Sequence, residues 1–166
     1  MDVHDYNGAG RWSRAAIFAR YAAYAADLGV RPRDLTPREY THRDRRSVYP
    51  VMERVIEGIE AGDPACVELG VEFVEEDAKQ PFGKILKSNT ARALRRAVLT
   101  DRQRRRIRRR VLGMLRAGHV PHEFAEYAKL VKRVGFTPAD LGDVPGTSDR
   151  VARFRRYLAA AARDGG

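Results

Sequence analysis

The residues with the clearest capacity for chemistry are the arginines of one segment, TDRQRRRIRRRVLGMLRAGH, which covers residues 100–119. The segment holds eight arginines and no lysine. Arginine presents a planar fork of N–H donors that binds phosphate or carboxylate groups through two bonds at once. Like charges one helical turn apart destabilise a helix by about 0.2–0.5 kcal/mol per pair. The segment therefore predicts a partner that supplies negative charge.

The charge of the chain is concentrated at two places. Residues 92–116 contain eleven arginines and one acid, whereas residues 53–77 contain nine acids and one base. The formal net charge of the whole chain is +10, which is also the charge of residues 92–116 alone. A dense basic stretch is typical of proteins that contact the phosphates of DNA or RNA.

Helical periodicity divides the 100–119 segment into two faces. If Ile107 is the centre of the buried face, Gln103, Val111 and Met114 extend it into a core stripe. The outward side then carries Arg102, Arg105, Arg109 and Arg116. We predict a nucleic-acid-binding surface made of these four arginines together with Lys84, Lys87, Arg95, Arg96 and Arg106. Aromatic residues do not alternate with the arginines, so no platform for stacking single-stranded bases is predicted there.

A second predicted helix carries the opposite charge on its outward face, at Glu68, Glu72, Glu75 and Glu76. The alternative hypothesis is therefore a helical interaction module, whose basic and acidic faces bind each other, an acidic protein surface or a second copy of the chain. A charged face that is merely solvated is the third reading, because most charge runs have that fate.

Three of these glutamates, Glu72, Glu75 and Glu76, also have the spacing that a metal or acid–base site on one helix face would need. No histidine lies within that motif. His119 and His122, beside Glu123, are too few ligands for zinc. The sequence thus predicts no metal site and no cofactor.

Sequence motifs give no support for an enzyme. The single cysteine, Cys66, lies on the apolar side of its predicted helix, where a buried thiol is the usual outcome. The chain has no GxSxG motif, no glycine-rich phosphate-binding loop and no dinucleotide fingerprint. A catalytic site assembled from distant residues would leave no local motif. The N-terminal MDVHDYNGAG lacks the features of a signal peptide and no stretch reads as a membrane span, which predicts a cytoplasmic protein.

Helix signals are frequent along the chain, and we predict an all-α fold of six to seven helices packed as antiparallel neighbours. A helix from Trp12 to a stop at Gly29 is predicted first, and TPRE at 36–39 has the form of a capping box. The remaining predicted helices cover about 47–61, 64–77, 84–98, 100–117, 121–134 and 149–163. These elements form one predicted domain at 11–163, with a flexible segment at 1–10 and a frayed end at 164–166.

Two segments of the chain resemble each other without gaps. FARYAAYAADLGVRPRDL at 18–35 and FAEYAKLVKRVGFTPADL at 124–141 agree at eight positions. Shared helix-ending chemistry explains the matching Gly and Pro, but not the matching Phe, Ala and Tyr upstream. The match favours a helix-turn unit that is duplicated at the two ends of the domain.

The sequence therefore predicts a non-catalytic, nucleic-acid-binding accessory protein, with the interaction module as the alternative. DNA or RNA, sequence preference and oligomeric state are left open.

Overall fold

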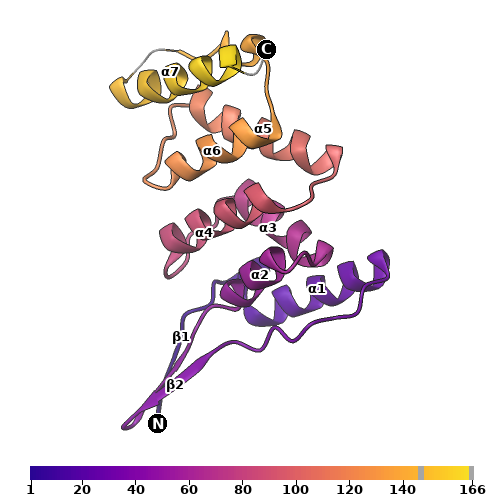
Figure 1. Cartoon of the computed structure of the whole chain (residues 1–166). Coiled ribbons are helices and arrows are strands. Elements are labelled where there is room, and N and C mark those ends of the chain that lie inside the picture. The colour runs from indigo at the N-terminus through magenta and orange to yellow at the C-terminus, as the bar shows by residue number, and fades with distance from the viewer. Residues whose placement is uncertain (146–147, 165–166) are drawn as a thin grey trace. The chain divides into compact units, whose positions relative to one another are not determined.

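The computed structural model describes residues 1–145 and 148–164, and these residues are mostly helical (Figure 1). The chain divides into two compact units, unit 1 at Met1–Val98 and unit 2 at Leu99–Gly166. The sequence predicted one domain over 11–163 and a flexible segment at 1–10, and Asp2–Asp5 of that segment form a strand. No helix in the described part of the chain is both long enough and apolar enough to cross a bilayer.

Unit 1 combines four α-helices with a small sheet. Its helices are α1 (Arg14–Leu28), α2 (Val51–Glu60), α3 (Pro64–Glu76) and α4 (Gly83–Arg96), and a short 3₁₀ helix, η1 (Gly10–Trp12), precedes α1. Helix α3 packs against α1, α2 and α4, so nine of its thirteen residues are buried. The core of this unit therefore surrounds α3, with the Trp12 ring edge-on to Phe73 at a centroid distance of 4.9 Å.

The sheet of unit 1 has the strand order β1-β3-β2. Strand β1 (Asp2–Asp5) pairs in parallel with β3 (Arg45–Val48), and β2 (Glu39–His42) pairs with β3 as an antiparallel hairpin. Figure 1 shows this ribbon extending away from α1 and α2, with the N-terminus at its far end. The all-α prediction is therefore correct for most of the chain, but it missed these three strands.

The capping box predicted at 36–39 does not form. The carboxylate of Asp34 accepts bonds from the backbone N–H and the hydroxyl of Thr36, at 2.8 and 2.6 Å. The side chain of Glu39 instead bonds Arg46 across the hairpin. The helix predicted from residue 47 begins later, at Val51, because Pro50 holds the preceding residue out of the helical conformation.

Unit 2 consists of α5 (Asp101–Arg116), α6 (Phe124–Val134), the 3₁₀ helix η2 (Pro138–Leu141) and α7 (Asp149–Asp164). Helix α6 packs against both α5 and α7. Ile107 and Val111 of α5, and Tyr127 and Leu158 of the other helices, are completely buried. Asp164 ends α7, whereas the rest of the predicted frayed end, 165–166, lies outside the described residues.

Each of the two similar segments contains a helix, α1 in the first and α6 in the second, but the segments differ in the burial of one phenylalanine and in how the helix ends. Tyr21 and Tyr127 are both buried, whereas Phe18 is 39% exposed and its counterpart Phe124 is fully buried. Gly29 ends α1 in the left-handed conformation, with φ 64° and ψ 30°. Gly135 ends α6 with φ 90° and ψ 148°, and η2 follows. The duplication stays a prediction.

Cys66 is fully buried in α3, as predicted, and burial raises the pKa of its thiol. Because the thiolate is the reactive form, we expect native protein to resist alkylation by iodoacetamide at neutral pH. Mass spectrometry should detect labelling only as fast as unit 1 unfolds, and full labelling once denaturant is added. Rapid, complete labelling of the native protein would contradict this burial.

Candidate nucleic-acid interface

The arginine-rich helix α5 begins with the capping box that its sequence predicts. The hydroxyl of Thr100 accepts the backbone N–H of Gln103 at 3.2 Å, and the side-chain oxygen of Gln103 accepts the backbone N–H of Thr100 at 2.9 Å. The predicted core stripe, Gln103, Ile107, Val111 and Met114, is buried. This stripe fixes the rotation of the helix, and therefore which arginines point away from the core.

Three of the arginines predicted to point outward do so. Arg102, Arg105 and Arg109 are exposed, and within the described residues none of them has a hydrogen bond or an ion pair. Their spacings of three and four residues place them on one face of α5. These guanidinium groups are therefore available to a ligand.

Other arginines of α5 bond to backbone carbonyls inside unit 2. The Nε of Arg108 donates to the carbonyl oxygen of Gly135 at 2.6 Å, and Nη2 of Arg116 donates to that of Asp140 at 2.8 Å. Arg116 is therefore half-buried and braces α5 against η2, rather than extending the exposed row. Arg106 is also half-buried and is engaged with neighbouring groups.

The basic residues of α4 that were predicted to bind nucleic acid also fall into an exposed group and an engaged group. Lys84 and Arg96 are exposed. Lys87 is only 7% exposed, and its Nζ lies 2.6 Å from Oδ1 of Asp77. Arg95 is half-buried and is engaged with neighbouring groups. Lys87 is thus part of a buried ion pair and is not placed to contact a phosphate.

Charge is distributed unevenly between the two units. Unit 2 contains 16 basic and 7 acidic residues, whereas unit 1 contains 16 basic and 15 acidic residues. Unit 2 therefore carries a net charge of +9 out of the total of +10. Helix α7 contributes exposed arginines at positions 153, 155 and 156. Most of the net positive charge of the chain therefore lies in unit 2, and such an excess attracts anions electrostatically.

The acidic face of α3 is largely engaged within unit 1, whereas the sequence predicted that it faces outward. Glu72 is only 8% exposed, and its carboxylate accepts bonds from Arg20 and from the hydroxyl of Tyr24. Glu76 accepts the Nε of Arg11 and the indole N–H of Trp12, each at 2.8 Å. Groups of η1 and α1 therefore occupy the oxygens of Glu72 and Glu76. The remaining two glutamates of this face, Glu68 and Glu75, are half-buried and engaged with neighbouring groups.

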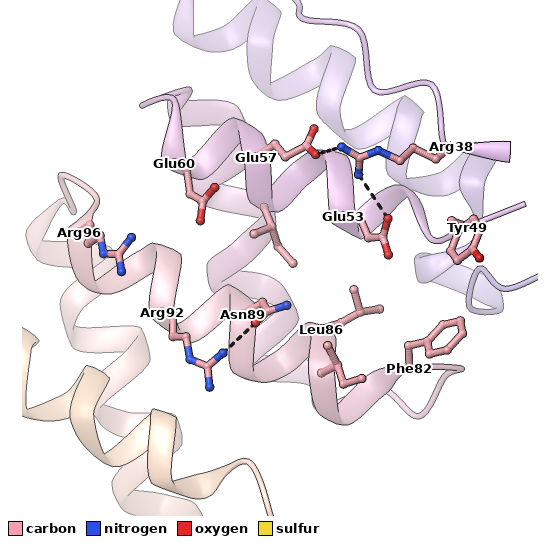
Figure 2. A pocket seen from close by; sticks show the side chains of 12 residues that line it. Arg38, Tyr49, Glu53, Glu57, Glu60, Phe82, Leu86, Asn89, Arg92 and Arg96 are labelled. Atoms are coloured by element: carbon pink, nitrogen blue, oxygen red, sulfur yellow. Dashed lines mark hydrogen bonds and ion pairs between the residues drawn. The ribbon is translucent and has the colours of Figure 1, made fainter. Parts of the chain in front are cut away.

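A cavity of about 520 Å³ lies between α2 and α4 (Figure 2). Its lining includes the buried side chains of Ile56 and Leu86. Figure 2 shows Tyr49 and Phe82 at one end of the cavity and Glu60 and Arg96 at the other. Phe82 is 45% exposed and adopts a left-handed backbone conformation with φ 57°, which is costly for a bulky residue.

The acidic wall of this cavity is largely neutralised. Arg38 bonds both Glu53 and Glu57, and Arg54 bonds Glu57 at 2.9 Å. Burial alone would raise the pKa of Glu57, but these two guanidinium groups outweigh it and hold that pKa below its ordinary value. The opposite wall carries Arg92, which donates to the amide oxygen of Asn89 at 3.0 Å. The lining offers no cysteine, serine or histidine that could serve as a nucleophile or base.

The described residues contain no group of three or more His, Cys, Asp and Glu side chains arranged to hold a metal ion. The side chain of His119 is exposed, whereas that of Glu123 is buried.

Sequence reasoning missed the aromatic residues at the sheet, which are the exposed Tyr40 and His42 and the half-buried Tyr6. The sequence signal in EYTHRDRRSV at 39–48 is weak: Tyr40, Thr41 and Val48 favour strands, but the two-residue turn Arg43-Asp44 contains neither glycine nor asparagine. A typical β-hairpin signature has alternating apolar residues on both sides of such a turn, which explains why the sequence did not predict this one.

No protein-family model, no curated protein and no solved structure matches this chain. An assignment of function therefore rests on the residues themselves.

Proposed function

We propose that this protein binds nucleic acid through unit 2, with Arg102, Arg105 and Arg109 of α5 contacting backbone phosphates. The observation that carries the proposal is that these three guanidinium groups share one helix face and have no partner among the described residues. No described carboxylate pairs with them to offset their mutual repulsion, and a row of phosphates would remove it.

The residue type supports phosphate as the ligand. Each guanidinium offers paired donors that match two oxygens of one phosphate, and helix α5 carries no lysine. Contacts of this kind position a protein on a duplex or a folded RNA without reading its sequence. The proposed role is therefore non-catalytic binding to the backbone.

The acidic face of α3 gives little support to the alternative of an interaction module. Glu72 and Glu76 already accept bonds from Arg11, Trp12 and Arg20 within unit 1. The alternative that remains is direct binding of α5 to an acidic protein surface or to a second copy of the chain.

The test is a salt titration of binding to labelled duplex DNA and to structured RNA. The triple variant Arg102→Gln, Arg105→Gln, Arg109→Gln should bind more weakly than the wild type. On duplex DNA, the slope of log K against log[salt] should fall in magnitude by about 0.9 for each phosphate that the variant no longer neutralises. Thermal unfolding should change little, because all three side chains are exposed.

The matched control is the triple variant Arg153→Gln, Arg155→Gln, Arg156→Gln in α7, which removes the same charge from the same unit. If α5 is the interface, the control should keep most of the wild-type slope. Equal losses in the two variants would show attraction to the net charge alone. Tight binding to neither DNA nor RNA, together with a dimer that the α5 variant dissociates, would favour the protein partner.

A further inference from the structure

The sheet of unit 1 contributes almost nothing to the core. Every residue of β1 and β2 is exposed, and Val48 is the one buried residue of β3. A small sheet normally needs an apolar face packed on other elements to be stable. The exposed side chains of Tyr40 and His42 are not packed in the core of unit 1 and are open to a ligand.

Strand register brings aromatic side chains together on one face. Tyr40 and His4 both pair with Ser47, so the short serine lies between two rings in one cross-strand row. In the next row, His42 and Asp2 both pair with Arg45. Residues two apart on a strand share a face, so the two rows face the same side.

An open hollow of about 470 Å³ results on this face, lined by Tyr6, Tyr40, His42, Arg45 and Ser47. The rings of Tyr40 and His42 are parallel within 4°, with centroids 6.5 Å apart. Aromatic pairs interact at centroid separations of about 4.5–7 Å, so these two rings form a stacked pair, and both side chains are exposed to solvent. Tyr40 is 60% exposed.

Positive charge lies at the same hollow. The Nη2 of Arg45 donates to the hydroxyl of Tyr6 at 3.2 Å, which holds the guanidinium beside the rings. Arg43, at the hairpin turn, is exposed and has a positive φ of 52°. Asp2 is the acid in the two rows. Flat, solvent-exposed rings beside arginine are the elements that proteins use to hold unpaired bases and their phosphates.

We propose that this sheet face binds single-stranded nucleic acid, with bases stacked on Tyr40 and His42 and a backbone phosphate at Arg45. The site belongs to unit 1 and uses none of the α5 arginines, so it goes beyond the phosphate contacts proposed for unit 2. It would add a preference for unpaired strands to a protein that otherwise recognises only the backbone.

The experiment measures fluorescence anisotropy of a labelled oligothymidylate of about 12 nucleotides and of an abasic oligomer of the same length. Tyr40→Ala should weaken oligothymidylate binding about 10-fold or more, because stacking on one aromatic ring supplies that much affinity. His42→Ala should also weaken it. Tyr40→Phe keeps the ring and should bind as wild type does. Thr41→Ala, on the opposite face of β2, is the matched control and should change nothing.

Two outcomes would overturn the proposal. The abasic oligomer should bind much more weakly than oligothymidylate, and equal affinity would mean that phosphates alone are recognised. Equal affinity of Tyr40→Ala and Thr41→Ala would also exclude stacking. Repeating Tyr40→Ala in the α5 triple variant separates the two proposals. The factor by which Tyr40→Ala weakens oligothymidylate binding should be the same in that variant as in the wild type. Failure of duplex binding would leave the oligothymidylate result intact.

Discussion

Glu72→Ala is expected to lower the free energy of unfolding of unit 1 by about 3–5 kcal/mol. The Glu72 side chain is only 10% exposed and that of Arg20 is 15% exposed. The carboxylate accepts bonds from Arg20 and from the Tyr24 hydroxyl, and Nη2 of Arg11 lies 3.4 Å from it. Removing the carboxylate would leave the guanidinium of Arg20 poorly solvated and without its anion. That uncompensated buried charge is the source of the loss.

Fluorescence of Trp12 is a suitable measurement for this prediction, because it is the single tryptophan of the chain and lies in unit 1. The guanidinium carbon of Arg20 is 4.5 Å from the centre of the indole ring, so the probe is at the affected place. Urea unfolding of Glu60→Ala provides the control. Glu60 is exposed at the end of α2, and its loss should change stability by no more than about 0.5 kcal/mol.

A double variant makes the first prediction sharper. Replacing both charges, as Arg20→Met with Glu72→Met, removes the unpaired ion and fills the space with apolar atoms. It should therefore be more stable than Glu72→Ala. If Glu72→Ala unfolds at the same urea concentration as Glu60→Ala, the buried network does not support unit 1.

Gly58→Ala is expected to lower the free energy of unfolding of unit 1 by about 2 kcal/mol, because it overpacks the contact between α2 and α3. A Cβ at Gly58 would lie 2.3 Å from Sγ and 2.9 Å from Cβ of Cys66. Neither atom can move without a shift of α3, since Cys66 is fully buried. Urea unfolding followed by circular dichroism and by Trp12 fluorescence measures the loss.

The control for this second prediction is a helical glycine in open space. A Cβ at Gly113 of α5 would have no neighbour within 4 Å, so Gly113→Ala should keep or raise stability through the better helix propensity of alanine. Combining Gly58→Ala with Cys66→Ala should recover part of the loss, because the sulfur is removed. A stabilised Gly58→Ala protein would mean that the two helices are not in close contact there.

Local sequence was sufficient to predict much of the helical framework. Helix α3 begins at the predicted Asp63-Pro64, and the Asp63 carboxylate accepts the backbone N–H groups of Ala65 and Cys66. Helix α5 begins with the predicted box of Thr100 and Gln103. Such caps join residues two or three positions apart, and helical periodicity spans only a few turns. Both caps and periodicity can therefore be predicted from short stretches of sequence.

The same locality explains which part of the site was predictable. The exposure of Arg102, Arg105 and Arg109 follows from their angle to the apolar stripe of their own helix. The bonds of Arg108 and Arg116 do not, because their acceptors, the carbonyls of Gly135 and Asp140, lie 27 and 24 residues away. An arginine whose stem can reach another segment is not distinguishable by its helix angle from one that remains in solvent.

Sequence by itself thus determined where the chain becomes helical, how most helices start and stop, and that Arg102, Arg105 and Arg109 of α5 face outward. Tertiary structure alone decided that Asp2 pairs with Arg45 and that Glu72 lies beneath α1 rather than in water. It also decided that Tyr40 and His42 line an open hollow on the sheet. The physical reason is that strand pairing and ion-pair burial depend on groups far apart along the chain, whereas caps and periodicity depend on neighbours.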